Sequence, residues 1–131
     1  MKKNGILNKE LCNLIGSLGH LDTIIISDAG LPIPKDVQRI DLALIPNLPT
    51  LVEVLEAILK ELIVEKVIMA EESLKVSPKI NKDVSRLVGN IPFEMIPHKE
   101  LLIKSEKCKA IVRTGEFTPY ANTLLICGCA Y

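Results

Sequence analysis

The sequence has few aromatic residues and no excess of charge of either sign. Its 131 residues include no Trp, two Tyr and two Phe, and 16 basic residues balance 16 acidic ones. With so few rings to stack on bases and no net positive charge, binding to nucleic acid or to an anionic membrane is disfavoured. The composition therefore favours a small, uncharged partner.

Long apolar runs are also missing. No run approaches the roughly 18 to 20 residues that span a bilayer, because Glu56, Lys60 and Glu61 interrupt the longest candidates. The first 16 residues mix polar and apolar side chains, whereas a signal peptide has a continuous apolar centre. We therefore expect a cytoplasmic protein with no membrane segment.

Several familiar motifs are absent as well. The sequence contains no G-x-G-x-x-G, G-x-x-x-x-G-K-[ST], H-E-x-x-H or G-x-S-x-G pattern. Its four cysteines form no C-x-x-C pair and are interpreted as reduced thiols. Cys127 and Cys129 could share a metal from one strand face, but no further ligands lie nearby, which favours small buried side chains. We expect neither a metal nor a cofactor.

The apolar content and its periodicity predict an α/β fold. Hydrophobic residues make up 48% of the chain, which is enough for a substantial core. The pattern predicts helices over 9–17, 51–62, 78–88 and 99–105, and strands over 23–27, 39–45, 64–70, 93–96, 109–114 and 123–130. Strands alternating with helices indicate one layered domain over residues 1–131, with a mostly parallel central sheet flanked by helices.

The stretch 18–34, LGHLDTIIISDAGLPIP, carries two titratable side chains at the two ends of one short predicted strand. His20 precedes the strand and could donate a proton, or could instead cap the end of the preceding helix. Asp28 follows the strand, where α/β sheets bind ligands. Its carboxylate could bind a polyhydroxylated ligand or act as a base, or could only shape the Asp-Ala-Gly turn. Both interpretations stay open for each residue.

Further candidates lie later in the chain. His98 follows a proline at a predicted helix start, so it could reach a ligand or only cap that helix. Tyr120 and Asn122 flank Ala121, and in an extended conformation their side chains would face the same way. A hydroxyl and an amide are neutral groups suited to sugar hydroxyls, although the same residues are common in turns. The pair Glu71-Glu72 could bind a cation, but a solvated strand end explains it better.

The sequence resembles the D-ribose pyranase family of sugar mutarotases, which includes a fucose mutarotase branch. The matching pieces are LGHLDTIIISDAGLPIP at 18–34, RIDLAL at 39–44, VIMAEE at 67–72 and VRTGEFTPYAN at 112–122, in this order. The resemblance implies a cofactor-independent enzyme that interconverts the β-pyranose and β-furanose forms of D-ribose and so supports ribose uptake and phosphorylation. Fucose mutarotation, or sugar binding without catalysis as an accessory protein, remains the alternative.

The same resemblance implies roles for single residues and an assembly. It makes His20 the proton donor, and it assigns sugar binding to Asp28, His98, Tyr120, Ala121 and Asn122. It also implies a cytoplasmic, ring-forming homo-oligomer, a decamer of two stacked pentameric rings with active sites between subunits. A small domain with so much aliphatic surface independently favours an oligomer.

Overall fold

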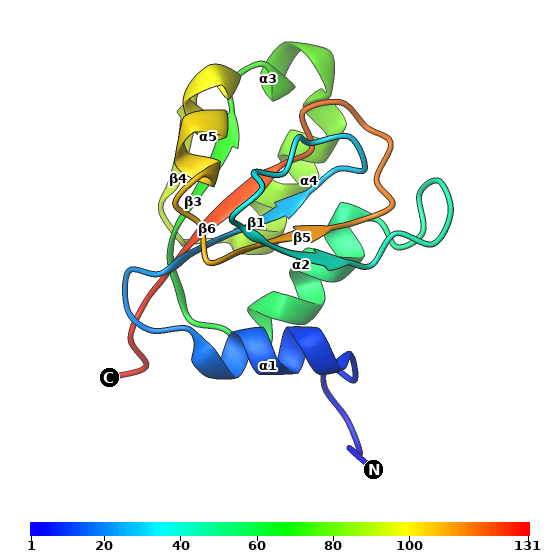
Figure 1. The fold of residues 1–131 in the computed structure, drawn as a ribbon. Coiled ribbons are helices and arrows are strands. Elements are labelled where there is room, and N and C mark those ends of the chain that lie inside the picture. The colour runs from blue at the N-terminus through cyan, green and yellow to red at the C-terminus, as the bar shows by residue number, and fades with distance from the viewer.

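A six-stranded mixed β-sheet forms the centre of the computed structural model, which describes residues 1–131 (Figure 1). The strands are β1 (Thr23–Ser27), β2 (Gln38–Asp41), β3 (Val64–Ala70), β4 (Phe93–Ile96), β5 (Ala110–Arg113) and β6 (Thr123–Cys127). The helices are α1 (Lys9–Ser17), α2 (Leu51–Leu59), α3 (Ser73–Val76), α4 (Pro78–Val88) and α5 (His98–Ser105). None of these helices has the length and apolar character needed to cross a membrane.

Five of the six strands run in one direction, so the sheet is mostly parallel as predicted, and the antiparallel β6 makes it a mixed sheet. The spatial order is β2-β5-β1-β6-β3-β4, and β6 runs antiparallel to both of its neighbours while the other pairs are parallel. A parallel crossover needs a connection of about a dozen residues or more, usually with a helix. The connection 114–122 between β5 and β6 is shorter and contains no helix, so the chain reverses direction there.

Two hydrophobic clusters cover the two faces of the sheet unequally. Helices α1, α2 and α4 pack on one face, where they form a cluster of 20 buried residues with the strands. On the other face, α5 and the segment after β1 contribute to a cluster of only 9 buried residues. The second face is therefore thinly covered, with α5 as its main helix (Figure 1).

Many element boundaries agree with the predictions, because local capping signals define them. The predicted bounds of α1, β1, β3, α4 and β4 are confirmed. Asn8 accepts a hydrogen bond from the Leu11 N–H at the start of α1. At α2, Thr50 and Glu53 form both bonds of a capping box.

Other boundaries are wrong because tertiary contacts override the local pattern. Strand β2 ends at Asp41 and not at 45, since residues 42–48 fold back into a loop that projects from the sheet (Figure 1). In that loop the Leu44 N–H donates to the Leu48 carbonyl at 3.0 Å. Helix α2 ends at Leu59, three residues early, β6 ends at Cys127, and the short helix α3 was not predicted.

Candidate functional site

The candidate site lies at the edge where β1, β3, β4 and β5 end and β6 begins. These four strands run in one direction and β6 in the other, so the segments after them meet the segment before β6. Ligands of α/β proteins bind outside the carboxyl ends of the strands. The topology therefore brings residues distant in sequence to one ligand-binding edge.

Asp28 and Asn122 form the central pair of this edge. The Asn122 Nδ2–H donates to Asp28 Oδ2 at 3.0 Å, and the Asp28 backbone N–H donates to Asn122 Oδ1 at 3.0 Å. Asn122 is 1% exposed, so its amide is locked in this one arrangement. The Gly30 N–H also donates to Asp28 Oδ1 at 3.0 Å, which closes an Asx turn. The carboxylate thus shapes its loop and borders the pocket at the same time.

Burial raises the pKa of the Asp28 carboxyl above its usual value of 3.8. Removal from water disfavours the charged form and is the largest cause. The N–H groups of Gly30 and Leu31, the Asn122 amide and the nearby His98 oppose this effect because they favour the carboxylate. A carboxyl held between these influences is suited to exchange a proton with a ligand.

His98 reaches the same edge as the first residue of α5. Its backbone N–H donates to both oxygens of the Glu72 carboxylate, at 3.2 and 2.9 Å, so Glu72 caps this helix from the end of β3. The imidazole packs edge-on against the Tyr120 ring, with centroids 5.1 Å apart, and its Nδ1 has no hydrogen-bond partner. His98 is therefore oriented by its helix and by Tyr120, and it does not act as the cap.

These side chains surround a hollow of about 280 Å³. It is lined by Asp28, Gly30, Leu31, Pro32, His98, Pro119, Tyr120 and Asn122. Ligand pockets begin at about 300 Å³, so this one suits a monosaccharide and is too small for a dinucleotide. Its polar groups are a carboxylate, an imidazole, a phenol and an amide, which together can donate to and accept from sugar hydroxyls.

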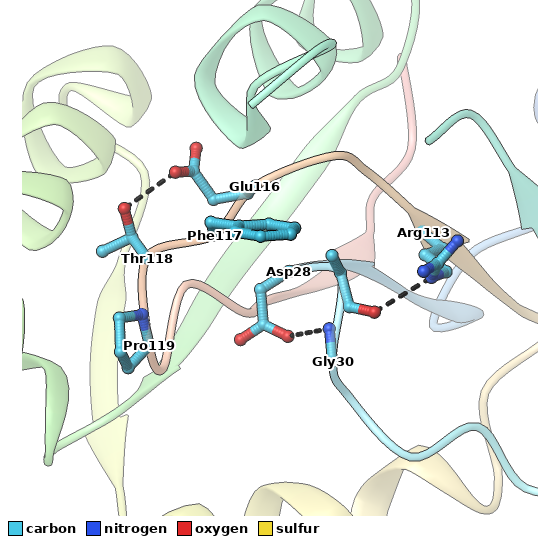
Figure 2. A pocket seen from close by; sticks show the side chains of 8 residues that line it. Asp28, Gly30, Arg113, Glu116, Phe117, Thr118 and Pro119 are labelled. Atoms are coloured by element: carbon cyan, nitrogen blue, oxygen red, sulfur yellow. Dashed lines mark hydrogen bonds between the residues drawn. The ribbon is translucent and has the colours of Figure 1, made fainter. Parts of the chain in front are cut away.

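A second hollow, of about 400 Å³, adjoins the first at Asp28 and Gly30 (Figure 2). Here Arg113 Nε–H donates to the Ala29 carbonyl at 3.0 Å, and the Ala29 N–H donates to the Glu116 carbonyl at 2.8 Å. The buried Glu116 side chain accepts from the Thr118 hydroxyl at 2.8 Å and from the backbone N–H of Leu51 at 3.0 Å. The turn that carries Asp28 is therefore held on both sides.

His20 lies at the opposite edge of the sheet. It precedes β1 whereas Asp28 follows it, and a five-residue strand spans about 16 Å. His20 is exposed, and its Nε2 lies 2.9 Å from Oε2 of Glu65, with no bond to a carbonyl of α1. Within one chain, the structure brings together Asp28, His98, Tyr120 and Asn122 but not His20.

The 120–122 segment reaches the pocket differently from the prediction. The extended conformation is wrong, because Tyr120 has a φ of 60° in a turn. Tyr120 and Asn122 nevertheless line the same hollow, since the turn directs both side chains into it. Ala121 is fully buried in the larger hydrophobic cluster and does not line the hollow.

Sequence reasoning missed Glu72, Arg113 and Glu116. One signal could have indicated Glu72. Helix α5 begins after Pro97, whose side chain cannot accept a hydrogen bond, so the free N–H groups of the helix need an acceptor from elsewhere in the chain. For Arg113 and Glu116 the partners are distant in sequence, and no local pattern indicates them. No group of three or more His, Cys, Asp or Glu side chains is placed to hold a metal ion.

The fold and the pocket define an α/β protein with a small polar pocket at the carboxyl edge of its sheet. Comparison with known proteins identifies the family within this class. The chain belongs to the RbsD/FucU transport protein family, whose model matches residues 1–130.

Individual relatives cover the whole chain. It is 47% identical to a D-ribose pyranase of Geobacillus thermodenitrificans over 98% of this chain and 97% of that one. It is 46% identical to a D-ribose pyranase of Coprothermobacter proteolyticus over the full length of both. Among solved structures, the complex of Bacillus subtilis RbsD with D-ribose superposes with a TM-score of 0.97 at 42% identity, covering 100% of both chains.

A more distant structure shares the fold alone. The fucose mutarotase of Streptococcus pneumoniae in complex with L-fucose is 22% identical, with a TM-score of 0.80 over 95% of each chain. The fold is therefore common to proteins that bind different monosaccharides.

Proposed function

We propose that this protein is an isomerase that interconverts the β-pyranose and β-furanose forms of D-ribose. Residues 1–131 would act as one sugar-mutarotase domain in the cytoplasm, where imported ribose is phosphorylated. The observation that carries the proposal is the bonded pair Asp28–Asn122, which faces His98 and Tyr120 across a monosaccharide-sized hollow. Four relatives named D-ribose pyranase, at 45–47% identity over 98–100% of this chain, support the same activity.

The reaction needs one acid and one base. A base removes the proton from the C1 hydroxyl while an acid protonates the ring oxygen O5, and the C1–O5 bond breaks to give the open-chain aldehyde. After rotation of the chain, the C4 hydroxyl attacks C1, loses its proton, and the carbonyl oxygen regains one. Positioned acids and bases accelerate such proton transfers by about 10² to 10⁴-fold.

We assign the proton donor to His20 and sugar binding to Asp28, His98, Tyr120, Ala121 and Asn122. Asp28 and His98 are the two candidates for the base. Because His20 and Asp28 lie at opposite edges of one chain, one protomer cannot bring both to one sugar. A complete site then needs His20 of a second copy at the edge that carries Asp28.

This requirement supports the ring-forming oligomer, for which we propose a decamer of two stacked pentameric rings. Exposed apolar side chains offer contact surface: Leu44 is 75% exposed, Ile45 59% and Phe117 62%. Leu44 and Ile45 lie on the projecting loop 42–48, next to the loop that carries Phe117 (Figure 1). Exposed apolar groups of this kind mark protein–protein contacts.

Ribose is favoured over fucose as the substrate. Identity to the D-ribose pyranases is 44–47%, whereas identity to the fucose mutarotase structure is 22%. The pocket chemistry alone does not separate the two sugars, since both present neutral hydroxyls. The assignment within the family therefore depends on the sequence relationship.

Two-dimensional exchange NMR on D-ribose and on L-fucose, with and without the protein, tests the proposal. We expect faster exchange between the pyranose and furanose cross-peaks of ribose and little change for fucose. Stoichiometric ribose binding by calorimetry with unchanged exchange rates would make the protein a non-catalytic sugar-binding accessory. Acceleration for fucose alone would move it to the mutarotase branch.

A further inference from the structure

The contact between His20 and Glu65 joins two segments that are 45 residues apart in sequence. His20 Nε2 and Glu65 Oε2 lie 2.9 Å apart, and the side chains are 49% and 41% exposed. An exposed ion pair contributes little to stability, because water and salt screen the two charges. Stability therefore gives little reason for this pairing, and its effect on the imidazole is the more important consequence.

The turn that carries His20 is held in one conformation. The Gly19 N–H donates to Asp22 Oδ2 at 2.8 Å, and the Leu21 N–H donates to the Cys127 carbonyl of β6 at 2.9 Å. Leu21 adopts a φ of 68°, in the left-handed region that is strained for a residue other than glycine. The bonds on both sides of His20 maintain this strained turn, so its backbone is fixed before any ligand arrives.

Glu65 occupies an irregular position in β3. The register with β6 passes from Val64 opposite Cys127 to Lys66 opposite Ile126, so Glu65 is the extra residue of a β-bulge. Such bulges are frequent next to active sites, where they redirect a side chain. Across from it, Gly128 leaves room, since a Cβ there would lie 3.3 Å from the Glu65 Cβ and 3.1 Å from Ile63 Cγ2.

We propose that Glu65 is the positioning residue for His20. An ionised carboxylate only accepts hydrogen bonds, so Nε2 must carry the proton that bridges to Glu65. The imidazolium then has Nδ1–H as the proton it can give to the ring oxygen of the sugar. After transfer the neutral ring keeps Nε2–H on Glu65, and Nδ1 is ready to take a proton back. This inference rests on the proposed function.

The test compares Glu65→Ala and Glu65→Gln with the control Lys66→Ala. Lys66, the next residue of β3, forms another exposed pair with Glu94 of β4, at 2.8 Å and with side chains 43% and 47% exposed. Because misplacing a reacting group by about 1 Å can cost 10²-fold, we expect Glu65→Ala to lower kcat for ribose exchange by about 10- to 100-fold. KM should change little, since Glu65 binds the imidazole and not the sugar.

Glu65→Gln retains an acceptor oxygen for Nε2–H, so it should recover much of the lost kcat, and Lys66→Ala should match the wild type. Equal kcat in Glu65→Ala and Lys66→Ala would reduce the contact to a surface ion pair and overturn the inference. ¹⁵N NMR of histidine-labelled protein gives a second readout, since the chain has only two histidines. A neutral His20 that carries its proton on Nδ1 would also overturn it.

The experiment distinguishes a failure of this inference from a failure of the proposed function. If the wild type does not accelerate ribose exchange, the proposed function fails, whatever the variants do. If the wild type is active and Glu65→Ala is equally active, only the role of Glu65 fails.

Discussion

Asp28 closes its turn and borders the pocket with the same carboxylate. Its Oδ1 closes the Asx turn with Gly30, while its Oδ2 accepts from Asn122 at the edge of the sugar-sized hollow. From the sequence these were alternatives, because either role alone explains an aspartate before Ala-Gly. Only the position of Asn122, 94 residues away, reveals that the carboxylate that shapes the turn also borders the pocket.

The protonation of Asp28 predicts how ribose binding depends on pH. Both carboxylate oxygens face N–H donors, so adding a proton would place a donor against a donor and disturb the pocket. Since burial raises the pKa of Asp28 above 3.8, affinity should be full above that raised pKa and be lost as pH falls through it. Calorimetric titration with ribose at a series of pH values should place the midpoint above pH 3.8.

Asn122→Ala should move this midpoint further up, in addition to weakening binding. The substitution removes a hydrogen bond that lowers the pKa of Asp28, while burial, the largest cause, still raises it. The exposed Asn90 supplies the control, and Asn90→Ala should leave the midpoint in place. A midpoint at lower pH in Asn122→Ala would contradict the assigned cause of the shift.

At the scale of single elements, the sequence predicted the helix and strand boundaries that depend on neighbouring residues. Capping by Asn8 and Thr50 and a run of β-branched residues in 23–27 were sufficient to place α1, the start of α2 and β1. The ends of β2 and α2 were misplaced because distant contacts decide them. Glu61, predicted inside α2, instead accepts a hydrogen bond from the Ile6 backbone N–H at 2.6 Å.

The projecting loop 42–48 packs against the segment that leads into the site, and Gly115 is the point of contact. A Cβ on Gly115 would lie 2.6 Å from the Leu48 carbonyl oxygen and 2.7 Å from that of Ile45. Gly115→Ala should therefore lower the free energy of unfolding by about 1 to 3 kcal/mol, since two backbone atoms would have to move.

Denaturant unfolding of Gly115→Ala beside Gly16→Ala checks this expectation. Gly16 lies in α1, and a Cβ there would meet nothing within 4 Å. Alanine in a helix is favoured over glycine by about 0.5 to 1 kcal/mol, so the control should be more stable than the wild type. An unfolding midpoint of Gly115→Ala no lower than that of the wild type would show that the loop yields without cost.

Glu72 is expected to act on ribose binding through α5. Its carboxylate is the acceptor for the first N–H of the helix, at His98, and losing such a cap costs about 0.5 to 2 kcal/mol. Glu72→Ala should thus destabilise the protein by this amount and weaken ribose binding, because His98 is the residue that the cap positions.

Glu71→Ala provides the comparison, since Glu71 is adjacent and exposed. Thermal unfolding and ribose calorimetry on both variants should show a loss for Glu72→Ala alone. Matching losses in both variants would mean that negative charge at the end of β3, and not the hydrogen bonds of the cap, stabilises this region.

At the scale of the whole molecule, the topology explains why the site was only partly predictable. Insertion of the antiparallel β6 between β1 and β3 places Asn122 beside Asp28, and the parallel β4 delivers His98 to the same edge. Residue types and short spacings identified these side chains as candidates, but strand order is a property of long-range pairing. The same topology separates His20 from Asp28, although only a short strand divides them in sequence.

This separation predicts that two inactive variants will complement one another. His20→Ala should retain the fold and ribose binding but lose most exchange activity, and Asp28→Ala should lose binding. If each site takes His20 from one copy and Asp28 from another, unfolding and refolding an equal mixture should give sites with both side chains intact. Random assembly would restore about one quarter of the wild-type exchange rate per site.

Refolding each variant alone is the control, and exchange NMR on ribose is the measurement. Mass spectrometry verifies that mixed oligomers form. If such a mixture is no more active than its components, His20 of one copy does not complete the site that carries Asp28 of another.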